Sequence, residues 1–287
     1  MKKGIILAVI AVLFFSTSPI FTRTAFEFSP HQVAFFRMLG GSFFIATFKL
    51  GFARQRISLR EFKTKYIIYG IITAFHFLFY IYALFYISIA HTLVLVYTAP
   101  VYVYLYELIK GYRVKALEVI GLCFTLAGLI ILVGFEPEAD LTFFVGAGMA
   151  FVSALCLSIY SLFGRREKDH SDLLTYTFWL YLMSAVVLFP FALNNWQVSS
   201  SIPDILSLVG LALFPTALGH TIYNWALRNV RSFYPSLIAT QEVTGGIILG
   251  ALLLGEIPTI QTLGGTILSL AGIILIVYLS HQAGTKS

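Results

Sequence analysis

Residues 236–256 read SLIATQEVTGGIILGALLLGE, a stretch made almost entirely of apolar and small side chains. It is long enough to cross a bilayer, for which a helix needs about 20 residues. Gln241 and Glu242 lie inside it, although a carboxylate at the bilayer centre costs about 2.5–3.5 kcal/mol even on lenient scales. The stretch therefore predicts a spanning helix whose carboxylate faces the interior of a helix bundle.

The rest of the chain has the same apolar character. It has 287 residues, 59% hydrophobic and 11% charged, whereas soluble domains average about 45–50% apolar and about 25% charged residues. The apolar segments are 4–22, 31–50, 66–89, 91–110, 116–134, 143–163, 173–193, 205–227, 233–254 and 259–280. The sequence thus predicts an all-α polytopic membrane protein with ten transmembrane helices. The first segment could also be a signal peptide, but its cleavage pattern is poor.

The basic residues predict the orientation in the membrane. Of the 19 Lys and Arg, all except Arg23 and Arg37 lie at the two ends of the chain or in alternate connections. The positive-inside rule places these regions, and hence both termini, on the cytoplasmic side of a plasma membrane. The basic excess therefore indicates topology and contact with the lipid bilayer, and we expect no nucleic-acid partner.

The two halves of the chain resemble each other at an offset of 142–144 residues. FSPHQVAFFRML (28–39) aligns with HSDLLTYTFWLY (170–181), and LAGLIILV (126–133) aligns with LAGIILIV (270–277). Five segments per half is an odd number, so the second repeat enters the membrane from the opposite side. We predict inverted five-helix repeats at 1–136 and 141–282, a construction that many secondary transporters share.

These features resemble the EamA-type transporters of the drug/metabolite transporter superfamily over nearly the whole chain. The matching positions are the spacing Pro30 to Arg37, Ala99-Pro100, Gly255-Glu256, Gly264 and Gly272. The chain departs from the family pattern at Glu242-Val243, where Glu-Pro is common. The resemblance implies ten helices, alternating access and transport of a small metabolite or drug, often outward.

Polar residues inside the segments are the candidates for function. His76 and Tyr80 lie one helical turn apart, as do His220 and Asn224, and the two pairs are 144 residues apart. We predict that they face each other across a central cavity and bind substrate. The alternative is that they form hydrogen bonds that only tie helices together.

Four further residues complete the predicted substrate site: Tyr97, Trp179, Gln241 and Glu242. Aromatic walls suit a flat or partly apolar solute. Trp179 could instead fill the core. For Glu242 three roles stay open: a protonated, hydrogen-bonded group, a partner for a substrate amine or an arginine, or a carrier of a coupling proton.

A second set of residues is predicted to have structural or gating roles. The family resemblance aligns Arg37 with an arginine that is usual in the family, and we expect Arg37 to have a structural role. Pro100 permits a kink in the fourth segment. Gly246 and Gly250 form a G-x-x-x-G pattern that favours close helix contact.

The sequence lacks motifs for nucleotide-driven transport, metal binding or serine hydrolysis, so we expect no cofactor and no metal. The favoured function is a secondary transporter, acting as an exporter of small organic metabolites such as amino acids or drugs. The alternative is an intramembrane enzyme acting on lipid or isoprenoid substrates. The oligomeric state is left open, a monomer included.

Overall fold

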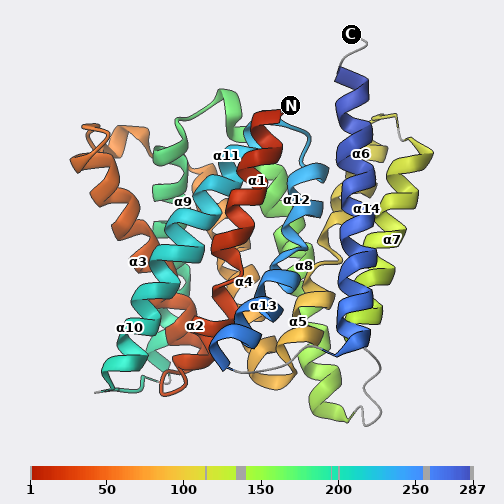
Figure 1. Ribbon diagram of the computed structural model, residues 1–287. Helices are drawn as coiled ribbons and strands as arrows, with labels where there is room; N and C mark the ends of the chain where they lie inside the picture. Colours follow the sequence, from red (N-terminus) through yellow and green to blue (C-terminus); the bar gives the residue numbers. More distant parts are fainter. Residues whose placement is uncertain are drawn as a thin grey trace.

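The computed structural model describes residues 2–113, 115–133, 140–194, 196–199, 201–254 and 259–284, which are helical with no strand among them. The first half contains α1 (Lys2–Phe15), α2 (Ser18–Thr24), α3 (Pro30–Gly51), η1 (Leu59–Glu61), α4 (Lys65–Tyr86), α5 (Ile89–Val96), α6 (Ala99–Ile109) and α7 (Ala116–Val133). The second contains α8 (Leu141–Arg166), η2 (Glu167–Asp169), α9 (Leu173–Asn194), α10 (Ile202–Leu211), η3 (Ala212–His220), α11 (Thr221–Asn229), α12 (Phe233–Ala239), α13 (Glu242–Leu254) and α14 (Ile260–Gly284). They stand as one upright bundle (Figure 1).

Seven helical runs are long and apolar enough to cross a membrane, which agrees with the predicted all-α membrane protein. They are Lys2–Thr24, Pro30–Gly51, Lys65–Tyr86, His91–Ile109, Leu141–Asp169, Leu173–Asn194 and Ile202–Asn229. The fifth and tenth predicted segments contain shorter apolar helices, Ala116–Ile131 and Leu263–Ile276. The ninth is divided into α12 and α13.

Three predicted spans are interrupted near their middle. The breaks lie at Ser16-Thr17, Tyr97-Thr98 and Thr240-Gln241. Pro19 and Pro100 lie in the first turn of α2 and α6, where a missing N–H costs least. The kink predicted at Pro100 is therefore a break just before it. Backbone groups freed at such breaks must be satisfied inside the protein, because the bilayer offers them no partners.

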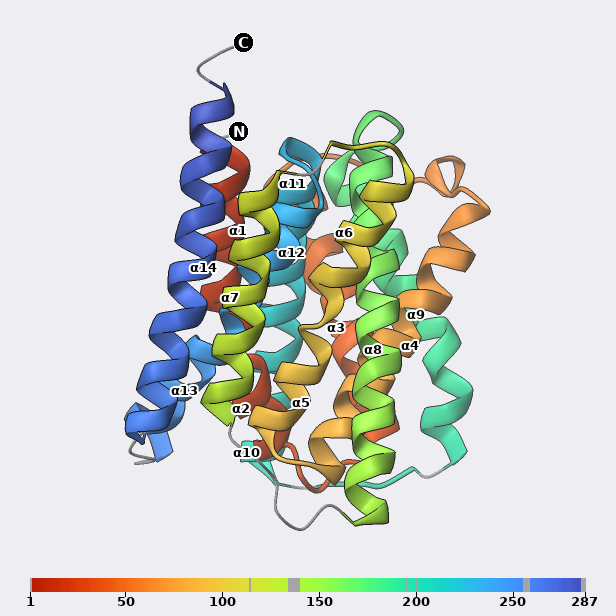
Figure 2. The same ribbon diagram turned by 90° about the vertical axis from the view of Figure 1, so that its right-hand side faces the viewer.

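Segments from the two halves pack in matching ways. The helix pair α3 and α9 is formed by the second and seventh predicted spans, and α7 and α14 by the fifth and tenth. Figure 2 shows α7 and α14 side by side at one edge of the bundle. Small residues allow this approach: a Cβ at Gly272 would lie 2.5 Å from the carbonyl oxygen of Gly121.

The glycine contact predicted in α13 lies one residue away from its expected position. A Cβ at Gly246 would meet nothing within 4 Å, so this residue does not mediate a close helix contact. A Cβ at Gly245 would instead lie 2.6 Å from Cβ of Ser16, at the break between α1 and α2. Gly250 follows farther along α13. The close approach therefore joins two helix breaks.

Several ion pairs lie at the bundle end at which α1 begins, which we call the termini end (Figure 1). Arg231 there pairs with Glu107 at 2.7 Å and with Glu118 at 3.2 Å. Burial alone would lower the pKa of Arg231, but these carboxylates raise it above its ordinary value. Lys65 pairs with the buried Glu167 at 2.5 Å. Both interactions join the first half of the chain to the second.

Replacement of Arg231 by Gln should destabilise the protein, because Glu107 and Glu118 would stay buried without their cation. We expect the free energy of unfolding to fall by about 2–4 kcal/mol. Thermal unfolding of the purified protein in detergent measures this change. Arg113→Gln, at an exposed position near the start of α7, is the control. An equal loss in both variants would argue against a role for the ion pairs.

Candidate functional site

A small cavity of about 20 Å³, room for about one water molecule, lies in the interior of the bundle. Its walls are Phe15, Ser18, Arg37, His76, Phe77, Tyr80, Val96, Tyr97, Leu157, His220, Tyr223, Ala239 and Glu242. All three helix breaks contribute to it, as does the C-terminal end of the π-helix η3. Interrupted helices and π-helical turns are both common at functional sites.

Glu242 is the first residue of α13 and is 6% exposed. Its Oε1 accepts a hydrogen bond from the Tyr80 hydroxyl at 3.1 Å, and its Oε2 accepts one from the Tyr97 hydroxyl. The position also places the carboxylate at the positive end of the α13 dipole. Two phenol donors and a helix N-terminus therefore stabilise the buried carboxylate.

Arg37 extends from α3 into the same cavity and is 1% exposed. Its Nε donates to Oγ1 of Thr216 at 2.9 Å, and a terminal nitrogen donates to Oγ of Ser18 at 3.1 Å. The guanidinium carbon lies 4.2 Å from the centre of the Phe77 ring, a cation–π distance. The π-helix supplies one of these partners, since Thr216 lies in η3 and its hydroxyl also donates to the Leu211 carbonyl.

The two predicted histidines both reach the cavity. Nδ1 of His76 lies 3.1 Å from the Ser153 carbonyl oxygen on α8. Nε2 of His220 lies 3.5 Å from a terminal nitrogen of Arg37. Because a guanidinium only donates hydrogen bonds, this contact requires an unprotonated Nε2 on His220.

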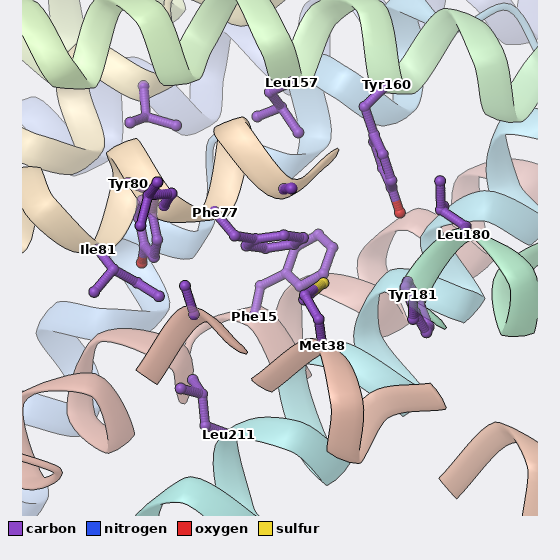
Figure 3. Close-up of a cluster of buried hydrophobic side chains, with 14 of the residues drawn as sticks. Phe15, Met38, Phe77, Tyr80, Ile81, Leu157, Tyr160, Leu180, Tyr181 and Leu211 are labelled. Carbon is purple, nitrogen blue, oxygen red and sulfur yellow. The ribbon is translucent and has the colours of Figure 1, made fainter. Parts of the chain in front are cut away.

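Aromatic rings limit the space around these polar groups. The rings of Phe15 and Phe77 lie 4.5 Å and 4.8 Å from the ring of His220, measured between centroids. Figure 3 shows Phe15 and Phe77 pointing into the space below α8, from which Leu157 and Tyr160 project. The space around the charged groups is thus narrow.

The family model for EamA-like transporters matches residues 2–134 and again 144–278. The chain belongs to the EamA-like transporter family. It is therefore a multi-pass membrane transporter. The two matched ranges cover each half of the chain once.

Relatives of this EamA-like chain carry transporter names. An uncharacterized transporter of Archaeoglobus fulgidus is 24% identical over 98% of this chain and 99% of its own length. The uncharacterized transporter YoaV of Bacillus subtilis is 24% identical over 77% and 78%. A protein of known crystal structure matches 99% of both chains with a TM-score of 0.83 at 18% identity, which shows a shared fold.

The structure brings together most of the predicted substrate-site residues of this EamA-like protein. His76, Tyr80, Tyr97, His220 and Glu242 all line the cavity. Arg37, predicted to be structural, lines it as well. Asn224 lies behind this wall, where its amide donates to the His220 carbonyl at 2.8 Å and to the Tyr160 hydroxyl.

Two predicted site residues lie elsewhere. Gln241 is the neighbour of Glu242 but faces α14, where its amide donates to Oγ of Ser269 at 3.0 Å. Trp179 packs its ring 5.0 Å from that of Phe62, away from the cavity walls. Helix geometry explains the first case, because successive residues point in different directions, and aromatic packing explains the second.

Several residues of the cavity wall are not among those predicted from the sequence. Ser18 binds Arg37 directly, and Phe15, Phe77 and Tyr223 close the space around it. The run Thr17-Ser18-Pro19 in an apolar segment was a usable signal, because it resembles the Thr98-Ala99-Pro100 run of the fourth segment. For the apolar residues the sequence offered no signal that separated cavity walls from ordinary core.

The hydrogen bonds to Glu242 should contribute measurably to stability. Tyr80→Phe and Tyr97→Phe each remove one donor to a buried carboxylate, which should lower the free energy of unfolding by about 1.5–3 kcal/mol. Thermal unfolding and a double-mutant cycle with Glu242→Gln measure the coupling.

Tyr104→Phe is a matched control, since this buried tyrosine has a hydroxyl without a hydrogen-bond partner. Its removal should be neutral or stabilising. Similar losses in all three tyrosine variants would mean that ring packing, and not the bond to Glu242, is what stabilises the site.

Proposed function

We propose that this chain is a secondary transporter that exports a small organic metabolite, such as an amino acid or a drug, by alternating access. The main support for this proposal is the cavity, which combines a buried cation and a buried carboxylate in the interior of the bundle. Such groups are expensive in hydrocarbon and mark substrate or ion pathways.

Both repeats contribute to this cavity, which supports a mechanism based on their relative movement. Arg37, His76 and Tyr80 come from the first half, and His220 and Glu242 come from the second. A site between inverted repeats is the arrangement expected of alternating access. We place the repeats at 1–136 and 141–282, with ten membrane crossings in total.

The present conformation is best described as occluded. At the end opposite the termini, the side-chain amide of Gln32 donates to the Gln197 carbonyl at 2.8 Å, and Ser207 donates to Thr24 at 2.8 Å. At the termini end, Arg231 joins Glu107. A cavity of about 20 Å³ holds no metabolite, so either end must open for binding and release.

The distribution of charge supports an orientation in the plasma membrane with both termini in the cytoplasm. The termini end contains the ion pairs of Arg231, Lys65 and Lys49 and the basic connections. Excess Lys and Arg favour the cytoplasmic side. Export is then movement from the termini end to the opposite end.

Ser153 and His76 lie as close as a serine nucleophile and its histidine base in an enzyme, because Oγ of Ser153 is 2.9 Å from Nδ1 of His76. Ser153 is fully buried on α8, does not line the cavity, and also contacts the His76 carbonyl at 3.0 Å. This geometry ties α4 to α8 and presents no hydroxyl to a substrate, which favours transport over lipid chemistry.

Purified protein in proteoliposomes should show saturable flux that competing solutes inhibit. We expect Glu242→Gln and His220→Gln to lower this flux by about tenfold or more, because each removes an interaction of a charged group worth about 1.5–3 kcal/mol. Membrane abundance of both variants should stay close to that of the unmodified protein.

Trp179→Phe is the control for a buried aromatic residue outside the cavity and should retain flux. Parallel loss of flux and abundance in the cavity variants would support a packing role. Absence of saturable flux across a broad solute screen, together with turnover of lipid, would refute the transporter function.

A further inference from the structure

Two opposite charges share the cavity without forming an ion pair. Arg37 comes from α3 and Glu242 from the start of α13, and among the described residues no ion pair joins them. Tyr80 contacts both: its ring centre lies 6.0 Å from the Arg37 guanidinium carbon, and its hydroxyl donates to Glu242. The charges are therefore held apart on different walls.

Neutral groups solvate each of these charges. A guanidinium has five N–H donors, and Arg37 directs three hydrogen bonds to the side chains of Thr216, Ser18 and His220. A carboxylate has about four acceptor positions, and Glu242 uses two of them for Tyr80 and Tyr97. Each group keeps capacity for a further, charged partner.

Three other buried carboxylates, those of Glu107, Glu118 and Glu167, are instead paired directly with cations. Glu107 and Glu118 contact Arg231 directly, and Glu167 contacts Lys65. Close ion pairs therefore form at the termini end of the same bundle. In the cavity, the hydroxyls of Ser18, Tyr80 and Tyr97 hold the two charges in place instead.

We propose that the solute is a small zwitterion whose cationic group binds Glu242 and whose anionic group binds Arg37. The inference rests on the transport function proposed above. A solute with one charge would give a charged partner to one wall only and would leave the other charge with its neutral partners alone. A zwitterion satisfies both walls and adds no net charge to the occluded site.

Phe77 and Tyr80 would then contact the part of the solute between its charges. Phe77 lies against the Arg37 guanidinium, and Tyr80 lies between the two charged side chains. We assign to Arg37 a role in selecting the solute.

The test begins with flux measurements in proteoliposomes for solutes of four kinds: cations, anions, zwitterions and uncharged metabolites. Straight-chain ω-amino acids with one to five methylenes provide a series of charge spacings. Each also exists as a methyl ester, which is cationic, and as an N-acetyl derivative, which is anionic. The solutes whose flux saturates should be zwitterions. Blocking the carboxylate or the amine of such a solute should weaken its competition for transport by about tenfold or more.

Glu242→Gln should selectively remove the preference for the free amine, so that a zwitterion and its N-acetyl derivative compete equally. Glu118→Gln removes the same charge from a buried carboxylate outside the cavity, and it should keep the preference even if overall flux changes. Arg37→Lys retains a cation and should preserve the requirement for an anionic group.

The outcomes separate the two levels of the proposal. Saturable flux confined to cations, to anions or to uncharged solutes would overturn the zwitterion inference and leave transport intact. Equal competition by blocked and free solutes on the unmodified protein, or an unchanged preference in Glu242→Gln, would also overturn it. No saturable flux for any solute would refute transport itself.

Discussion

The structure depends on one constraint: a membrane helix can be interrupted only where the protein itself satisfies the freed groups. Three breaks, at Ser16-Thr17, Tyr97-Thr98 and Thr240-Gln241, meet around one cavity. Glu242 begins the helix after the last break, and Tyr97 lies within the second. The hydrogen bond between these residues links the breaks of the two halves, so the carboxylate has both a structural and a local electrostatic role.

The repeat explains much of this arrangement but not its chemistry. His76 and His220, which are 144 residues apart, both line the cavity. Arg37 aligns with Trp179, yet Arg37 lines the cavity while Trp179 packs against Phe62. Equivalent positions can therefore share a place in the fold and differ in contacts, because the side chain decides which neighbours stabilise it.

The all-helical membrane class was predictable from the sequence, since hydropathy and length identify candidate membrane helices, and seven helical runs meet both criteria. The breaks were harder to predict, because Pro100 indicates a kink whereas no proline or glycine lies at Thr240-Gln241. The candidate site was predictable where a polar side chain stood in an apolar segment, as for His76 and Glu242. Gln241 passes the same test yet faces α14, since polarity alone does not give direction.

The two ends of the bundle are not energetically equivalent, although an inverted repeat, as proposed above, would by itself make them so. Arg231 joins Glu107 at the termini end. At an offset of 143 residues, Glu107 aligns with Gly250 and Arg231 aligns with Ser88, so the ion pair has no counterpart at the aligned positions. Opening the termini end separates a cation from a buried carboxylate. At the opposite end the bonds between the halves have neutral donors: Gln32 donates to the Gln197 carbonyl, and the Glu27 backbone N–H donates to the Asp204 carboxylate. Loss of one partner of a buried ion pair costs about 3–5 kcal/mol, whereas a hydrogen bond between a neutral donor and a charged group contributes about 1.5–3 kcal/mol. The ion pairs therefore favour closure at the termini end, and a solute that enters there must supply interactions that offset their loss.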